Sequence, residues 1–317
     1  MELRHLRYFL VVADEGHFTR AAERLGMQQP PLSQQIRALE QELGFSLFRR
    51  HPKGADLTPA GATFLAEARA ILDNVDQAAV RGRRVANGSA GAIAVGFTSS
   101  AAAHSLIPKI VRAYRAAWPD VSIDFKEGNA AELTEAIAEG KLHLGFVRLP
   151  VGSPPGIVYQ RLVEEEMLLV LPTGHALLTG QDQGQDGLPL ISLASLRDER
   201  FILVRRRGAS GMYANLIGAC ERAGFTPQIA VEVDRMLTNI GLVAAGVGIS
   251  AVPASMRGFH ADSVVYCRIR DGGPGLSAPL TLVTREDDLL PAARNFVDMV
   301  AQVLASSSDS QAAPANP

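Results

Sequence analysis

The chain has 317 residues, which is too long for one compact hydrophobic core, so its length predicts two or three structural units. Its 47% hydrophobic and 20% charged residues are typical of a globular protein, and no stretch approaches the roughly 20 apolar residues that span a bilayer. The formal net charge is −2, so any surface that attracts nucleic acid must be local.

The N-terminus and the metal-binding residue types exclude further classes. Residues 1–12 carry charged side chains and no long apolar run, so we expect no signal peptide and a cytoplasmic protein. Cys220 and Cys267 form no disulfide framework, and neither they nor the seven histidines have metal-ligand spacing. We therefore expect no metal and no cofactor.

Two short helices are predicted at the N-terminus. Apolar residues recur at helical spacing over residues 3–13, and Gly16 ends this segment. A second helix is predicted over residues 18–25, with His17 as a weak capping residue and Gly26 as its end.

A third helix is predicted to begin at Pro30 and Pro31, where proline costs little, and to end at Gly44. Its apolar stripe is Leu32, Ile36, Leu39 and Leu43. Its opposite face is polar near the start, where a recognition helix presents side chains to bases. The candidate DNA-binding residues of this segment are Gln28, Gln29, Pro30, Pro31, Ser33, Gln34 and Arg37. On the helix alone, a solvated polar face remains the alternative.

A basic hairpin follows this helix. Arg49, Arg50 and Lys53 cluster around a turn at residues 49–54, between apolar residues 45–48 and Leu57. Such a turn is suited to gripping DNA phosphates, which adds affinity but little sequence information. A polar-faced helix followed by a cationic turn predicts a winged helix-turn-helix.

A long linker helix is predicted from Pro59 to about residue 86, with Thr58 as its cap. Its apolar seam is near heptad spacing and consists of Phe64, Leu65, Ala68, Ile71, Leu72, Val75, Ala78 and Ala79. A helix this long buries such a seam most economically against a copy of itself, which would present two wings to an inverted-repeat operator. Residues 87–91 are predicted to be a hinge.

The N-terminal motifs are LRHLRYF at residues 3–9, FTRAAERL at 18–25, QPPLSQQI at 29–36, LFRR at 47–50 and LTPAG at 57–61. This nearly continuous pattern resembles the signature of LysR-type transcription regulators. The resemblance implies a promoter operator of double-stranded DNA with imperfect dyad symmetry, a homodimer or homotetramer, and RNA polymerase as a partner. Relatives often carry Arg where this chain has Gln34, so the operator sequence stays open.

From residue 91 the pattern changes to strands alternating with helices. The first set comprises strands 93–97, 121–125 and 142–147 and helices 106–117 and 130–139. This order implies a parallel sheet covered by helices. The second set comprises strands 167–171, 201–204, 229–233 and 249–252 and helices 210–223 and 235–245. The chain then returns through strands 264–269 and 280–283 to a last helix at 292–304.

The predicted fold class is therefore α/β, with a winged helix-turn-helix, a long linker helix and a two-lobed effector domain that resembles periplasmic binding proteins. The expected boundaries are 1–58 for the DNA-binding domain, 59–90 for the linker helix and hinge, 91–305 for the effector-binding domain and 306–317 for a disordered tail.

Ligands of open α/β sheets bind beyond the carboxyl ends of strands, at helix N-termini. That rule, with the family resemblance, predicts an effector site between the lobes. Its candidate residues are Thr98, Ser99, Ser100, Gly128, Asn129, Arg148, Phe201 and Ile202. For Ser99 the alternative is simple helix capping, and for Arg148 it is a weak ion pair with a neighbouring acid on the surface. Relatives that sense muconates often carry a hydroxyl residue near position 128. This chain has Gly128 and Asn129 there, so we do not infer a muconate as its inducer.

The predicted function is a sequence-specific DNA-binding transcription regulator controlled by a small-molecule inducer. The inducer is expected to be a small organic acid, with an aromatic-catabolism intermediate as the working hypothesis. Activation and repression both stay open. Ser99 and His104 lack a nucleophile elbow and a third partner, so we expect no catalytic residue and no enzyme.

The rival hypothesis is a solute-binding protein or a two-lobed enzyme whose N-terminal part only mediates assembly. The expected absence of a signal peptide argues against the first. A cationic turn has no purpose in a dimerisation arm, which argues against both.

Overall fold

The computed structural model describes residues 1–150, 152, 154–184, 186–204, 212–273, 275–287 and 289–311, with side chains as far as Ser307. The chain divides into two compact units, Met1–Arg84 and Val85–Pro317. The start of the helix predicted at 210–223 and residues 312–317 of the predicted tail lie outside the described residues. None of the helices in the described ranges has the length and apolar character needed to cross a membrane.

The first unit begins with a bundle of helices in which each apolar stripe faces inward. Helix α1 (Leu3–Glu15) ends at Gly16 in the left-handed conformation, and α2 (Phe18–Arg24) is capped by His17, whose Nδ1 accepts the Thr19 N–H. Helix α3 (Gln29–Leu43) begins with its prolines in the first turn and ends at Gly44. These boundaries confirm the helices predicted from apolar spacing and glycine stops. Leu32, Ile36 and Leu39 of α3 are completely buried.

The wing follows as an antiparallel hairpin of β1 (Phe48–His51) and β2 (Gly54–Leu57). It leads into α4 (Pro59–Ala86), whose first turn is capped when the Gly61 N–H donates to Thr58 Oγ1 at 2.9 Å. At this joint the helix approaches the wing so closely that a Cβ on Gly61 would lie 2.1 Å from the Leu47 carbonyl oxygen.

The apolar seam of α4 divides into two parts. Ala68 is completely buried in the core of the winged helix, and Phe64, Leu65, Ile71 and Leu72 pack against the same core. Farther along the predicted seam, Val75 is half-buried, and Ala78 and Ala79 are exposed. The first part of the predicted dimer seam therefore serves the core of its own unit, and only the later part is left for a partner.

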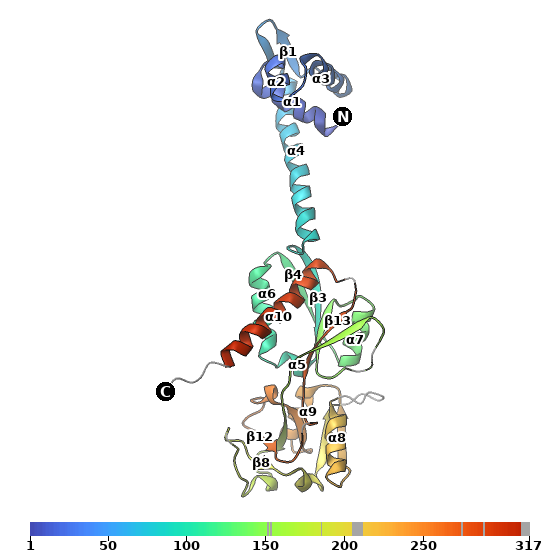
Figure 1. Cartoon of the computed structure of the whole chain (residues 1–317), viewed down its shortest axis with the longest axis vertical. Coiled ribbons are helices and arrows are strands. Elements are labelled where there is room, and N and C mark those ends of the chain that lie inside the picture. Colours follow the sequence, from blue (N-terminus) through green and yellow to red (C-terminus); the bar gives the residue numbers. More distant parts are fainter. Residues whose placement is uncertain are drawn as a thin grey trace, which may run out of the picture. The chain divides into compact units, whose positions relative to one another are not determined.

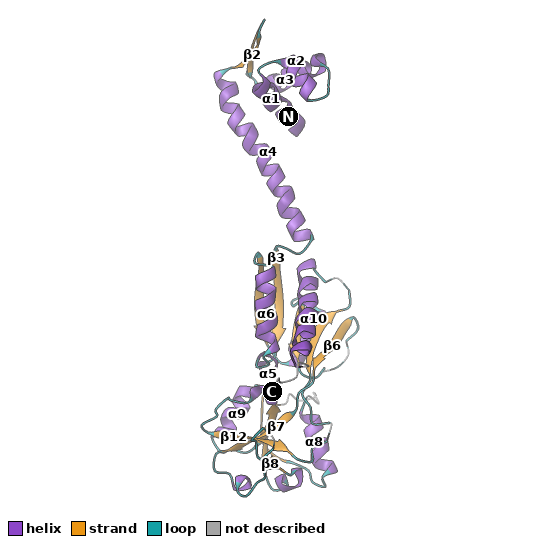
Figure 2. Cartoon of the chain, turned by 60° about the vertical axis from the view of Figure 1, so that its left-hand side comes forward, coloured by secondary structure: helices purple, strands orange, loops and turns teal. Residues whose placement is uncertain are grey.

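In the second unit, the first lobe is built on a five-stranded sheet with the order β4-β3-β5-β13-β6. Its strands are β3 (Gly91–Phe97), β4 (Val121–Glu127), β5 (Leu144–Val147), β6 (Ile157–Val163) and β13 (Leu280–Arg285). Helices α6 (Leu106–Ala117) and α10 (Pro291–Gln311) cover one face (Figure 2). Helix α7 (Ala130–Ala138) packs against the other face. A short helix, α5 (Ser99–Ala102), follows β3.

The second lobe contains a four-stranded sheet, β11-β7-β12-β8, and the parallel pair β10-β9, which a bridge between Phe201 and Ile249 joins to it. The strands are β7 (Met167–Pro172), β8 (Leu190–Ile191), β9 (Arg200–Val204), β10 (Gln228–Val233), β11 (Ser250–Pro253) and β12 (Val264–Ile269). Helices α8 (Tyr213–Arg222) and α9 (Met236–Ala244) supply its core with the strands (Figure 1). The two lobes meet where α5 packs against α9.

Two expectations about this unit are wrong. The sheets are mixed: β3 pairs in parallel with β4 and β5, but β13 is antiparallel to β5 and β6, and β7 is antiparallel to β11 and β12. The returning chain causes this, because a strand that re-enters a lobe from the other one arrives in the opposite direction. The tail predicted from residue 306 begins inside α10, which extends to Gln311.

Candidate functional site

The polar face of α3 is exposed at its N-terminal end. Gln28, the prolines and Gln34 are exposed, as is Arg37 one turn later, and Gln29 is half-buried. Ser33 is different, because it is only 7% exposed and lies on the side of α3 that faces the protein. The structure therefore corrects the prediction that Ser33 presents its hydroxyl to DNA.

The cationic residues of the wing fall into two groups. Arg49 and Lys53 are exposed, and His51 Nε2 lies 3.3 Å from Asp56 Oδ2 across the hairpin. Arg50 is exposed as well, but its guanidinium also contacts the helices: its Nη1 donates to Ser33 Oγ at 2.5 Å, and its Cζ lies 4.3 Å from the centre of the Phe18 ring. Burial lowers the pKa of the Arg50 guanidinium, and the positive charge of nearby Arg37 lowers it further. Arg50 nevertheless stays charged at neutral pH.

In the second unit, Ser99, Gly128 and Asn129 lie beyond the carboxyl ends of the neighbouring parallel strands β3 and β4. Asn129 caps α7 through a capping box: Asn129 Oδ1 accepts the Glu132 N–H at 2.9 Å, and the Asn129 N–H donates to Glu132 Oε2 at 3.1 Å. The cap of α5 is Thr98, whose Oγ1 accepts the Ala101 N–H at 3.2 Å. The capping role considered for Ser99 therefore belongs to Thr98, and Ser99 is half-buried in the first turn.

Arg148 is 4% exposed and lies at a junction of both lobes. Its guanidinium forms an ion pair with Glu165, and it donates to the carbonyl oxygens of Ser100 and Ala278 and to Ser255 Oγ. Glu165 in turn accepts the Ser255 N–H at 3.0 Å and the Ser255 hydroxyl at 2.8 Å. Arg148 therefore pairs with a neighbouring acid, as the alternative interpretation expected, but this ion pair is buried rather than on the surface.

Two other predicted contacts are corrected. Phe201 and Ile202 are completely buried in the core of the second lobe, so in this structure neither offers an apolar wall to a ligand. Ser100 is also buried, with its carbonyl oxygen held by Arg148.

Glu165 and Ser255 were not found from the sequence. A signal existed for Glu165, because three glutamates occupy residues 164–166 just before β7, but nothing local tells which of them turns inward. His104 belongs to the same neighbourhood: burial lowers its pKa, Glu165 raises it, and Arg148 and Lys109 lower it. A second ion pair joins the two lobes. It links Arg235, which precedes α9, to Glu127 at the end of β4, and both side chains are exposed.

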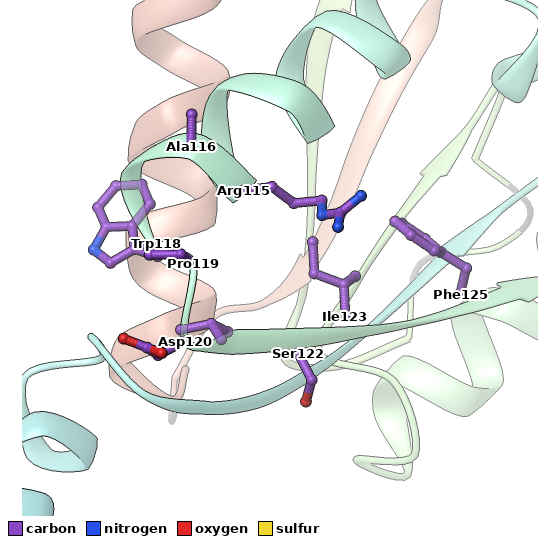
Figure 3. A pocket seen from close by; sticks show the side chains of 9 residues that line it. Arg115, Ala116, Trp118, Pro119, Asp120, Ser122, Ile123 and Phe125 are labelled. Carbon is purple, nitrogen blue, oxygen red and sulfur yellow. The ribbon is translucent and has the colours of Figure 1, made fainter.

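A groove of about 630 Å³ lies elsewhere on the first lobe (Figure 3). Arg115 and Trp118 at the end of α6 line it together with Ile123 and Phe125 of β4. It begins at the amino end of β4, whereas Gly128 and Asn129 follow the carboxyl end. It is therefore separate from the predicted effector residues.

An exposed polar helix start beside a cationic hairpin, carried by a chain whose second unit has two α/β lobes, defines a DNA-binding regulator with a ligand-binding domain. Residues 3–62 match the bacterial regulatory helix-turn-helix protein, lysR family, and residues 86–305 match the LysR substrate binding domain. The chain belongs to the LysR family of transcription regulators.

Individual relatives agree over nearly the whole length. The chain is 38% identical to the uncharacterized HTH-type transcriptional regulator YnfL of Escherichia coli (strain K12), covering 93% of this chain and 96% of that protein. It is 35% identical to the HTH-type transcriptional regulator AlsR of Bacillus subtilis (strain 168), covering 94% of each. Among solved structures, full-length CbnR complexed with its target DNA is similar, with a TM-score of 0.78 and 30% identity over 96% of this chain and all of that chain. The relatives are transcription regulators, which agrees with the prediction that the chain is not an enzyme.

Proposed function

We propose that this regulator binds an operator of approximate dyad symmetry as a homodimer or homotetramer, with the start of α3 in the major groove. The carrying observation is the exposed polar start of α3 next to the exposed cations of the wing. Gln28, Gln29, Pro30, Pro31, Gln34 and Arg37 face base edges in this proposal, and Arg49 and Lys53 bind phosphates. The later part of the α4 seam supports pairing of two copies, because Val75 is only half-buried and Ala78 and Ala79 are exposed. The regulator acts on RNA polymerase in the cytoplasm.

The test is a salt titration of the full-length protein on DNA from its own promoter region and on unrelated DNA. We expect a steep salt dependence on both and a large preference for the promoter fragment. The Arg49→Ala, Lys53→Ala double variant should reduce the slope of log K against log salt by about 1.8 for each bound wing, or about 3.6 for a dimer, since each phosphate contact contributes about 0.9. Equal affinity for both DNAs would contradict an operator in this fragment, and an unchanged slope in the double variant would contradict the role of the wing.

We further propose that a small organic acid binds between the lobes, near Ser99 and the Gly128–Asn129 turn. Both segments lie at helix starts beyond the carboxyl ends of adjacent parallel strands, where backbone N–H groups favour anions. Arg148, already neutralised by Glu165, is not needed for this contact.

Ser99→Ala is expected to weaken binding of the carboxylate inducer by about 10- to 150-fold, because a hydrogen bond to a charged group contributes about 1.5–3 kcal/mol. Benzoate and acetate serve as probes in isothermal titration calorimetry, with benzamide as the uncharged counterpart of benzoate. Ser105→Ala, an exposed serine at the start of α6 without a side-chain cap, is the matched control. Equal affinities of the two variants for a carboxylate that binds the parent would rule out the Ser99 contact.

A further inference from the structure

Arg50 differs from the other cations of the wing in what its side chain touches. It is the third residue of β1 and pairs with Ala55 in the hairpin register, so its backbone belongs to the wing. Its guanidinium, however, contacts Ser33 of α3 at 2.5 Å and lies 4.3 Å from the centre of the Phe18 ring at the start of α2. One side chain therefore joins the wing to both helices of the helix-turn-helix.

Both partners of Arg50 are fixed in the protein. Phe18 is 8% exposed and stacks edge-on against Phe48, with 5.6 Å between ring centres, and Ser33 is 7% exposed. A planar guanidinium that stacks on an aromatic face and donates a directed hydrogen bond is held in one orientation, which a lysine ammonium on a flexible stem does not reproduce. The contact therefore specifies geometry as well as charge.

Ser33 lies on α3 next to the residues that are proposed to face DNA. Gln29 lies one turn before it and Arg37 one turn after it, and Gln34 is its neighbour. A hydrogen bond at Ser33 resists rotation of α3 about its own axis. Such a rotation would move these exposed side chains out of register with base edges while leaving the total charge of the surface unchanged.

We infer that Arg50 is a positioning residue that sets the rotation of α3 relative to the wing, so that it controls discrimination between DNA sequences rather than binding a phosphate. The sequence placed Arg50 with Arg49 and Lys53 as a phosphate contact, and the two roles make opposite predictions. A lost phosphate contact weakens all DNA about equally and lowers the salt slope by about 0.9. A lost positioning contact weakens preferred DNA selectively and leaves the slope unchanged.

The experiment compares full-length Arg50→Ala with Arg49→Ala, a neighbouring exposed arginine of the same strand. Each protein is incubated with a random-sequence DNA library, and the bound DNA is sequenced. Affinity is then measured against salt for the enriched sequence and for unrelated DNA. For Arg50→Ala we expect a flatter sequence preference and a ratio of preferred to unrelated affinity about 10-fold lower, comparable to the cost of a mismatched base pair. For Arg49→Ala we expect the ratio to be kept and the slope to fall by about 0.9 for each bound wing.

Arg50→Lys separates the two roles without removing the charge. If Arg50 positions α3, the lysine variant loses discrimination like the alanine variant, because it lacks the planar stack on Phe18. If Arg50 binds a phosphate, the lysine variant keeps most of its affinity on every DNA. Retained discrimination in Arg50→Lys, or an Arg50→Ala variant that matches Arg49→Ala, would overturn the inference. A parent protein that enriches no sequence would instead contradict the proposed operator binding.

Discussion

Arg148→Ala is expected to lower the free energy of unfolding of the unit that begins at Val85 by about 3–5 kcal/mol, the usual cost of removing one partner from a buried ion pair. The variant leaves the Glu165 carboxylate, whose side chain is 12% exposed, without its cation. It also removes the donors to the carbonyl oxygens of Ser100 and Ala278. Because these groups come from both lobes, the loss falls on the junction between them.

Urea unfolding of the full chain, followed by the fluorescence of Trp118, measures this change. Trp118 is the single tryptophan and packs on Tyr114 in the first lobe, with 4.8 Å between ring centres. The matched control is Arg161→Ala, because the Arg161–Glu164 pair has side chains that are 64% and 46% exposed and such pairs contribute less than about 1 kcal/mol. Equal losses in the two variants would show that the Arg148 network does not stabilise the lobes.

The double variant Arg148→Met, Glu165→Met separates stability from ligand binding. Replacing both charges by apolar side chains of similar length is expected to recover the part of the stability lost to the unpaired charge, while the carbonyl oxygens of Ser100 and Ala278 stay without the Arg148 donors. If this stable variant still binds the carboxylates that the parent binds, Arg148 acts as an anchor of the junction. If binding is lost while stability is recovered, Arg148 contacts the ligand, and the proposal that places recognition at Ser99 needs revision.

The winged helix and the linker helix could be predicted from the sequence because their signals are local. Glycines at positions 16 and 44 end helices in the left-handed conformation, and Pro30 and Pro31 fit the first turn of α3. The apolar stripes of α1 and α3 follow helical spacing, so the predicted inward residues Leu6, Leu32 and Ile36 are buried. Each of these features needs only residues within one or two turns of one another.

Strand direction and partner choice were not predictable in the same way. The β6 segment, Ile157–Val163, was missed, and it pairs with β13, which lies more than a hundred residues later in the chain. The alternation of strands and helices indicates a layered α/β fold but does not reveal that a returning strand enters between β5 and β6. That arrangement depends on contacts between distant segments.

The surroundings of the candidate site residues could not be predicted from the sequence either. The sequence placed Phe201 and Ile202 in a strand and Arg148 at the end of one, which is where they lie. Their surroundings come from elsewhere: residues of α8, α9 and β11 bury the first two, and Glu165 and Ser255 surround the third. The contact of Arg50 with Ser33 likewise depends on how the wing folds back on α3. Residue type and position predicted the candidates, but exposure and partners required the fold.

Gly61→Ala is expected to lower the stability of the unit Met1–Arg84 by about 1–3 kcal/mol, although alanine favours a helix over glycine by about 1 kcal/mol. The added Cβ would lie 2.1 Å from the Leu47 carbonyl oxygen, which is backbone and accepts the Thr58 N–H at 2.9 Å. That oxygen cannot yield without breaking the hydrogen bond that joins the wing to the start of α4.

Gly82→Ala in the same helix is the matched control, since a Cβ there meets no described atom within 4 Å. It should raise the stability of the helix by about 0.5–1 kcal/mol. Hydrogen exchange of the full chain, read in peptides from residues 1–62 with peptides beyond Val85 as the internal reference, distinguishes the two. We expect faster exchange around the wing only in Gly61→Ala. Undiminished protection there would mean that the joint between wing and linker helix adjusts without cost, and that the close approach at Gly61 does not set how α4 leaves the DNA-binding unit.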